Sequence, residues 1–247
     1  MYVSLINSNN KNTTFGHNNP WADSPYNKKE KITVAATTAL GAFAGMACHA
    51  KLKGYSLNPK RMFRNIDKSY WNKIDFDDVP VIMIGAGSCL GGLTGGYIID
   101  KNKENRKAKK REALLQITNI SLPIISTVQM SNLGEKIGNK YWDKNRPANL
   151  QTYRTKLPKG LFALTGLLGG VFAANIIANK INEKIFHQGK GRPVQASDFS
   201  AHLDDFCVTA RQVSKAKITD YIQKLVPFAL MVAGNEIGNT TVENADS

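Results

Sequence analysis

VPVIMIGAGSCLGGLTGGYII, residues 79–99, is the stretch that decides the fold. None of its twenty-one residues is charged, and Pro80 stands near the start, where a helix does not need the N–H that proline lacks. At about 1.5 Å per residue, a helix of this length can cross the roughly 30 Å of hydrocarbon in a bilayer. The stretch therefore predicts a membrane-spanning helix.

Three more stretches are uncharged over a similar length. Residues 32–50 read ITVAATTALGAFAGMACHA, and residues 160–178 read GLFALTGLLGGVFAANIIA. Residues 113–133 are also uncharged but hold many polar side chains, among them Gln116, Asn119 and Gln129, so we expect neighbouring helices to shield this stretch from lipid. All three are predicted to span the membrane.

A fifth stretch, residues 218–237, is interrupted by Asp220, Lys224 and Glu236. Charge inside a bilayer is costly, so these residues are functional candidates if the stretch spans the membrane. Asp220 and Lys224 also make an ordinary pair four residues apart on a helix surface. The stretch is therefore equally consistent with a partly immersed or soluble helix.

Together these stretches predict an all-α, multi-pass membrane bundle over residues 32–237. The two ends, residues 1–31 and 238–247, are polar and are predicted to be disordered. We also predict a duplicated two-helix unit at 79–141 and 160–239, because each half ends in a helix with an internal proline and the motif G-x-x-I-G-N. A shared compositional bias is the alternative explanation.

Basic side chains dominate the charge. The chain holds 33 Lys and Arg against 19 Asp and Glu, a formal net charge of +14 that suits an anionic partner. Residues 51–78 and 101–112 hold seven basic residues each, and residues 134–157 hold six. No recognition helix or series of stacking aromatics accompanies them, so we expect anionic lipid headgroups and no nucleic acid. The mean hydropathy of −0.30 is low for a multi-pass protein and argues against the membrane interpretation.

Aromatic pairs give a weak indication of orientation. Tyr70 and Trp71 precede the second predicted helix, and Tyr141 and Trp142 follow the third. In a helical hairpin both pairs reach one interface, opposite the basic turn at 101–112. Placing that turn in the cytoplasm also places the N-terminus there, in an inner or plasma membrane. The pairs are equally consistent with ordinary loop aromatics.

Small residues recur at every fourth position of three predicted helices. Such residues share one helix face and let two backbones approach closely enough to drive helix association in lipid. In water, so many interior glycines would cost helix stability, at roughly 1 kcal/mol each relative to alanine. The rows are Thr37, Gly41 and Gly45; Gly87, Gly91 and Gly95; Ser88, Gly92 and Gly96; and Gly166, Gly170, Ala174 and Ala178.

These rows resemble the glycine-zipper segments of many bacterial membrane-associated proteins, a resemblance that implies close helix packing and no activity. The run GAGSCLG, residues 85–91, lacks the Lys-Ser/Thr ending of a phosphate-binding loop and the βαβ context of a dinucleotide fingerprint. Cys48, Cys89 and Cys207 are too widely spaced for a zinc motif or a disulfide framework. We therefore expect no cofactor.

One segment, SDFSAHLDDF at residues 197–206, contains side chains that bind metals in other proteins. Asp198, His202 and Asp205 recur at i, i+4 and i+7, on one face of a helix, and could ligate a divalent cation. The alternative is an amphipathic surface helix with a capped, acidic first turn and a solvated polar face. An apolar stripe along the other face favours this alternative, so we predict no functional metal.

No catalytic constellation stands out, so we do not expect an enzyme. The glycine faces favour a structural or scaffolding membrane protein that packs, or self-associates into a homo-oligomer, through them. A pore or channel is the alternative, because glycine-lined helices can form rings and the polar helix at 113–133 could line a path. The two differ in whether those polar side chains face a continuous cavity or are covered by neighbours.

Overall fold

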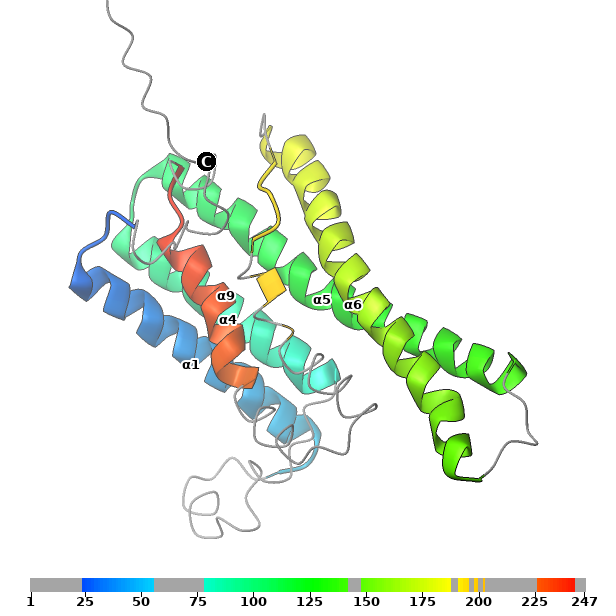
Figure 1. The fold of residues 1–247 in the computed structure, drawn as a ribbon. Helices are drawn as coiled ribbons and strands as arrows, with labels where there is room; N and C mark the ends of the chain where they lie inside the picture. The colour runs from blue at the N-terminus through cyan, green and yellow to red at the C-terminus, as the bar shows by residue number, and fades with distance from the viewer. Residues whose placement is uncertain are drawn as a thin grey trace, which may run out of the picture.

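The computed structural model describes residues 24–55, 78–141, 148–187, 191–195, 198–199, 202 and 226–242. These residues hold helices and no strand, so the predicted all-α fold is confirmed for the part of the chain that the structure describes. The long helices, shown in Figure 1, are α1 (Lys28–Leu52), α4 (Asp78–Ile99), α5 (Lys103–Tyr141), α6 (Ala148–Phe186) and α9 (Val226–Asn239).

Four of the helices are long and apolar enough to cross a membrane: α1, α4, α5 and the part of α6 from Lys156. They contain the four uncharged stretches of the sequence. Helix α9 has 14 residues and a length of about 21 Å, which is short of the hydrocarbon thickness of a bilayer. The remainder of the fifth predicted stretch, residues 218–225, lies outside the described residues.

The described residues extend beyond the predicted limits of the helical domain, residues 32 and 237, at both ends. The Asn27 side chain accepts the Glu30 N–H at 3.0 Å, and the Glu30 carboxylate accepts the Asn27 N–H at 2.8 Å, a reciprocal cap that starts α1 at Lys28. At the other end, Thr240 and Thr241 are buried beyond the last turn of α9. Residues 24–31 and 238–242, which lie in the ends predicted to be disordered, are thus held by caps and buried contacts in this structure.

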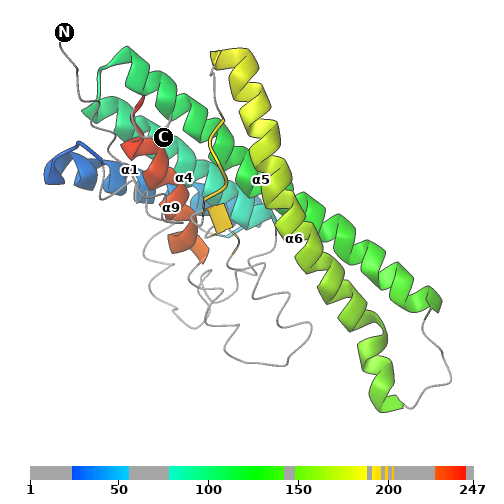
Figure 2. The same cartoon turned by 45° about the horizontal axis from the view of Figure 1, so that its top comes forward.

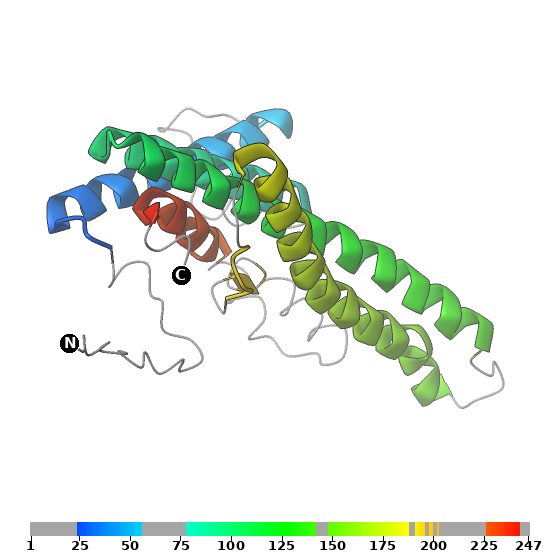
Figure 3. The same cartoon turned by 90° about the horizontal axis from the view of Figure 1, so that it is seen from above.

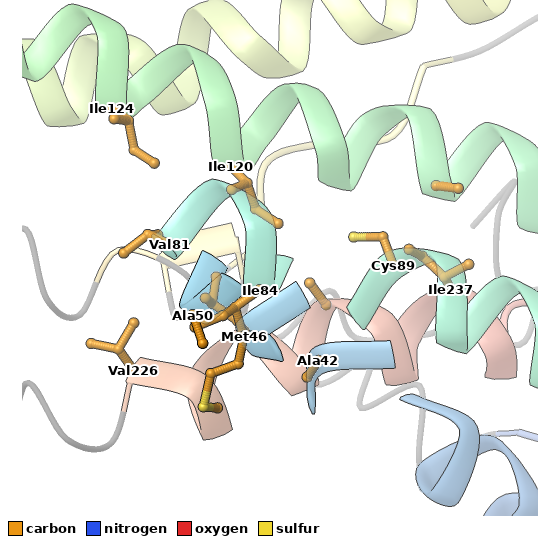
Figure 4. Close-up of a cluster of buried hydrophobic side chains, with 13 residues drawn as sticks. Ala42, Met46, Ala50, Val81, Ile84, Cys89, Ile120, Ile124, Val226 and Ile237 are labelled. Atoms are coloured by element: carbon orange, nitrogen blue, oxygen red, sulfur yellow. The ribbon is translucent and has the colours of Figure 1, made fainter. Parts of the chain in front are cut away.

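Helix α4 is the centre of the bundle. Helix α1 packs on it in the antiparallel direction, whereas α9 runs parallel to it, with Gly92 against Gly234 and Gly96 against Gly238. Helix α5 covers a third side, where the Ile120 side chain packs on Gly85. Buried side chains from all four helices form one apolar cluster, drawn in Figure 4, that includes Ala42, Met46, Val81, Ile84, Cys89, Ile120, Ile124, Val226 and Ile237.

Helices α5 and α6 form a long antiparallel hairpin. Each has 39 residues and measures about 58 Å, so the hairpin extends past the other helices, as Figures 1, 2 and 3 show. Near its base a segment outside the long helices, gold in Figure 1, lies beside both α5 and α6. We call this segment the strap and define it as Gly191–Gln195 together with Asp198, Phe199 and His202.

Candidate functional site: buried polar clusters in the bundle

The outer faces of the helices carry large apolar side chains. Leu40 of α1 is 68% exposed, Leu90 of α4 is 61% exposed and Phe172 of α6 is 54% exposed. Such extensive exposure of apolar surface is unusual for a protein in water and marks a contact with lipid or protein. Charged and amide side chains are instead buried between the helices; they include Lys109, Glu112, Gln116, Asn119, Arg192, Asp198, His202 and Glu236.

The small-residue rows lie at helix contacts. A β-carbon placed on Gly91 would stand 3.0 Å from Cα of Thr38 in α1, and one on Gly92 would stand 2.9 Å from Cα of Gly234 in α9. A side chain at either position would overlap a neighbouring backbone. The other row positions are placed similarly: Gly41, Gly45, Gly87 and Gly95 at the α1–α4 contact, Gly96 against α9, Gly166 and Gly170 against α5, and Ala174 fully buried.

Lys109 is the centre of the first polar cluster and is fully buried. Its ammonium group donates to the carbonyl oxygens of Gly238 at 3.0 Å and Thr240 at 2.6 Å, and to the Tyr26 hydroxyl at 2.9 Å. The last carbonyls of a helix lack partners within that helix and carry the negative end of its dipole. Lys109 therefore ties α5 to the C-terminal end of α9.

Asp100, between α4 and α5, belongs to the same cluster. Its carboxylate accepts hydrogen bonds from the Tyr26 hydroxyl, from the Asn102 N–H at 2.8 Å and from Nδ2 of Asn105 at 2.7 Å. Burial alone would raise the pKa of Asp100, but these hydrogen bonds and the charge of Lys109 hold it below its ordinary value. Burial and the bond to Asp100 raise the pKa of the Tyr26 phenol, which therefore keeps its proton.

Arg192 of the strap is the centre of the second cluster. Its Nη2 donates to Oδ1 of Asp198 at 2.6 Å, and its Nε lies 3.4 Å from Oε2 of Glu112 in α5. The carboxylates of Glu112 and Asp198 thus face the buried guanidinium of Arg192 and compensate its charge. Removing one member of such a buried group would leave an uncompensated charge.

A row of asparagines on α6 binds the strap backbone. Nδ2 of Asn175 and of Asn179 donate to the Arg192 carbonyl at 3.1 and 2.8 Å, and the Arg192 N–H donates back to Oδ1 of Asn179 at 3.1 Å. From the α5 side, Nδ2 of Asn119 donates to the Asp198 carbonyl at 2.8 Å. Side chains of α5 and α6 thus supply the hydrogen-bond partners that the strap backbone would otherwise find within a helix or a sheet.

Gln116 joins two carboxylates across the α5–α9 contact. Its Nε2 donates to Oε1 of Glu112 at 2.8 Å and to Oε2 of Glu236 at 2.7 Å. Glu236 is the one charged residue of the fifth predicted stretch that the structure places, and it is buried. Asp220 and Lys224 lie outside the described residues.

The surface location predicted for residues 197–206 is wrong at Asp198 and His202, which are 1% and 0% exposed. The Asp198 carboxylate also accepts the Gln195 N–H at 2.8 Å. Nε2 of His202 lies 2.8 Å from the Asn119 carbonyl oxygen, so this nitrogen carries the proton. Their polar atoms meet protein partners because the groove between α5 and α6 is itself polar. Asp205 lies outside the described residues, which hold no group of three possible metal ligands.

A small hollow borders the second cluster. Its volume of about 10 Å³ has room for about one water molecule. Nδ2 of Asn182 donates to the Arg111 carbonyl at 3.2 Å, but its Oδ1 is buried without a hydrogen-bond partner among the described residues. The hollow is lined by Ala108, Arg111, Glu112, Leu115, Asn179, Asn182 and Arg192.

Sequence reasoning missed Lys109, Glu112 and Arg192 as parts of buried clusters. Lys109 and Glu112 lie in the strongly charged first turns of α5. Nothing in the sequence of these turns indicates which side chains are buried. A usable signal was present in α6, where Asn175 and Asn179 recur four residues apart inside an apolar helix. Amides on one face of such a helix indicate a polar partner on that face.

Comparison with known proteins gives no match: no protein family fits the sequence, and no curated protein or solved structure is significantly similar to it.

Proposed function

We propose that the protein is an integral membrane protein with a structural role, a helix bundle that packs through its glycine faces. The observation that carries the proposal is the distribution of polarity. Large apolar side chains such as Leu40 and Phe172 lie outside, while charged and amide side chains such as Gln116 and Arg192 are buried. Apolar side chains are stable in contact with lipid, whereas charged and amide side chains are costly there.

Glycine contacts support assembly within one chain. The rows of α1 and α4 meet neighbouring helices of the same chain, and Gly166 and Gly170 meet α5. These faces are therefore occupied. A homo-oligomer would use a different face, and the outer face of α6 is the best candidate because Gly169 there has open space around it.

The distribution of lysines supports anionic headgroups as partners and a cytoplasmic N-terminus. Lys28 and Lys29 are exposed at the start of α1, and Lys101 and Lys103 are exposed between α4 and α5. The hydrogen bond between Tyr26 and Asp100 brings these two segments to the same end of the bundle. The aromatic pairs used for the orientation lie outside the described residues, apart from Tyr141.

Fractionation tests the proposal. We expect the full chain to stay with membranes through a wash in alkaline carbonate and to dissolve only in detergent, because four apolar helices would otherwise be exposed to water. A soluble, monomeric protein in the absence of detergent would rule the proposal out. A reactive reporter attached to the N-terminus, tested in sealed inside-out and right-side-out vesicles, would establish the orientation.

A pore is the second candidate, and one observation favours it. Irregular backbone and ionised side chains are tolerated at membrane depth only where protein covers them or where they line water. The strap and Arg192 meet this description beside α5. Against a permanently open path, Gln116 and Asn119 of α5 are covered by partners from α9 and the strap. Flux of small ions from vesicles that contain the purified protein would separate a pore from a purely structural bundle.

A further inference from the structure

The uncharged stretches of α1 and α4 lie at one height in the bundle. Gly41 is the middle residue of 32–50, and it packs against Gly87, two residues before the middle of 79–99. A β-carbon on Gly41 would stand 3.0 Å from the carbonyl carbon of Gly87. The two helices therefore share one apolar belt, whose middle lies at the height of these glycines.

Helices α5 and α6 share a second apolar belt. Pro123 is the middle residue of 113–133, and Gly170 is one residue past the middle of 160–178. A β-carbon on Gly170 would stand 2.6 Å from Cα of Pro123, so the middles of the two stretches meet. The hairpin thus presents its apolar surface around the height of Pro123.

The two belts are staggered along the bundle. Ile120 of α5 packs on Gly85 of α4, and a β-carbon on Gly96 would stand 2.8 Å from Cδ of Lys109. Between these contacts, the middle of the α4 stretch lies level with about Gln116 of α5. The middle of the α5 stretch is about seven residues, or about 10 Å, farther toward the tip of the hairpin, which extends past α1 and α4 in Figure 1.

Two exposed lysines at the base of the hairpin show the consequence of the stagger. Lys110 follows the residue that meets Gly96, and Lys180 is one turn from Asn182, which donates to the Arg111 carbonyl of α5 at 3.2 Å. Both lysines are therefore level with the C-terminal half of the uncharged α4 stretch. A bilayer centred on α4 and perpendicular to the helices would place them in hydrocarbon, where charge is costly.

Exposed apolar side chains give the same conflict. Phe162 of α6 meets Gly134 of α5, past the point where α4 begins, so a bilayer centred on α4 would leave the neighbouring Leu161 in water. A perpendicular bilayer centred on the hairpin would instead leave Ile32 and Ile98 in water. An interface that crosses the helices obliquely places all three apolar side chains in hydrocarbon and both lysines at the headgroups.

We propose that the bilayer meets the bundle obliquely, so that the lysines at the base of the hairpin join those of α1 and of the α4–α5 turn in one surface for anionic lipid headgroups. A stagger of about 10 Å across two helix widths of about 9 Å each corresponds to an angle of about 30°, within the range of membrane helices. The inference rests on the proposed membrane location and adds its surface and its partner.

The composition of this surface fits an anionic headgroup. Its exposed cations outnumber the accessible carboxylates that the described residues place at the same end, which are Glu30, Glu104 and Glu183. Each cation stands just outside an uncharged stretch, where its ammonium group can reach a lipid phosphate. The cations include Lys28, Lys29, Lys103, Lys110, Lys180 and Lys184.

The first experiment compares cysteines that lie at nearly one height on different helices. After replacement of the native cysteines by alanine, Leu90→Cys and Lys180→Cys form one pair, and Val79→Cys and Leu168→Cys form a second pair nearer the tip; all four positions are exposed. The full chain is placed in nanodiscs of phosphatidylcholine and phosphatidylglycerol, and the rate of labelling by a charged maleimide is measured. Glu104→Cys, exposed at the start of α5, gives the rate in water.

We expect Lys180→Cys to react at least about tenfold faster than Leu90→Cys, and Val79→Cys to react faster than Leu168→Cys. The reason is that a thiol in hydrocarbon neither ionises nor meets a charged reagent. Equal rates within both pairs would mean a perpendicular interface and would overturn the proposal. If all four cysteines react as fast as Glu104→Cys, the membrane location itself is wrong.

A second experiment tests the headgroup partner. A fluorophore on Ile177→Cys, one turn from Lys180, measures the preference of this site for brominated phosphatidylglycerol over brominated phosphatidylcholine through quenching. Lys180→Gln with Lys184→Gln should lower that preference by about fivefold or more, because cations near the surface attract anionic headgroups. Lys180→Arg with Lys184→Arg keeps both charges and should retain the preference. An unchanged preference in the glutamine variant would show that these lysines do not meet headgroups and would overturn the proposed surface.

Discussion

Gly92 of α4 and Gly234 of α9 touch through their backbones, so that a β-carbon on Gly92 would stand only 2.9 Å from Cα of Gly234. The two helices run parallel here, and Gly96 repeats the contact one turn later with Gly238. No side chain fits between them. The absence of side chains lets α4 and α9 approach this closely, and the Ser88 hydroxyl of α4 also joins them by donating to the Leu230 carbonyl of α9 at 2.8 Å.

Gly92→Leu should therefore destabilise the bundle by about 1–3 kcal/mol or more, because the backbone of α9 cannot move away without opening the core. Gly169→Ala is the matched control: it lies on α6 with open space around it, and alanine should leave stability unchanged or raise it by up to roughly 1 kcal/mol. Unfolding in detergent, followed by circular dichroism, measures both. Equal melting of Gly92→Leu and the native chain would remove the packing argument.

Lys109→Met should destabilise the protein by about 3 kcal/mol. The substitution leaves the carbonyls of Gly238 and Thr240 buried without their donor, and it removes the cation at the negative end of the α9 dipole. Lys110→Met, the neighbouring exposed lysine, should change stability by no more than about 0.5 kcal/mol. If both variants unfold at the same denaturant concentration, Lys109 does not hold the end of α9.

The Asp100 carboxylate accepts the hydrogen bond of Tyr26, so acid should weaken the contact that holds residues 24–31 against the bundle. Its pKa is held below the ordinary value of 3.8, so its contribution to stability is present above that pH and is lost as the pH falls through the lower, folded-state pKa. We expect the protection of amide protons in residues 24–31 against hydrogen exchange to fall as the pH drops below 3.8, and to be fully lost only below the folded-state pKa. Asp100→Asn should exchange rapidly at neutral pH as well, whereas the exposed Glu104→Gln should behave like the native chain.

His202→Ala should cost about 2–4 kcal/mol, because it empties a fully buried position and leaves the Asn119 carbonyl without a donor. Zinc or manganese should not shift the melting temperature of the native chain, since His202 and Asp198 already bind protein groups. A metal-dependent rise in stability that disappears in His202→Ala would falsify this assignment and revive the metal site.

The sequence was sufficient for the bundle itself. Charge-free stretches about as long as a bilayer's hydrocarbon core is thick can satisfy their backbones in lipid only as helices, so 32–50, 79–99, 113–133 and 160–178 predict helices without knowledge of their neighbours. The four-residue spacing of Gly87, Gly91 and their counterparts is equally local, since it places small residues on one face of a helix whatever that face meets.

Tertiary structure alone decided which polar residues are buried together. Asp198 and His202 follow the pattern of a surface helix in sequence, yet they are buried because the strap lies between α5 and α6, far away in the chain. Glu112, Arg192 and Glu236 are separated by tens of residues, and their pairing depends on how three segments pack. Helix formation follows from local hydrogen bonding and hydropathy. The partners of a buried charge instead come from segments that are far apart in the chain and that only the fold brings together, so no short stretch of sequence encodes them.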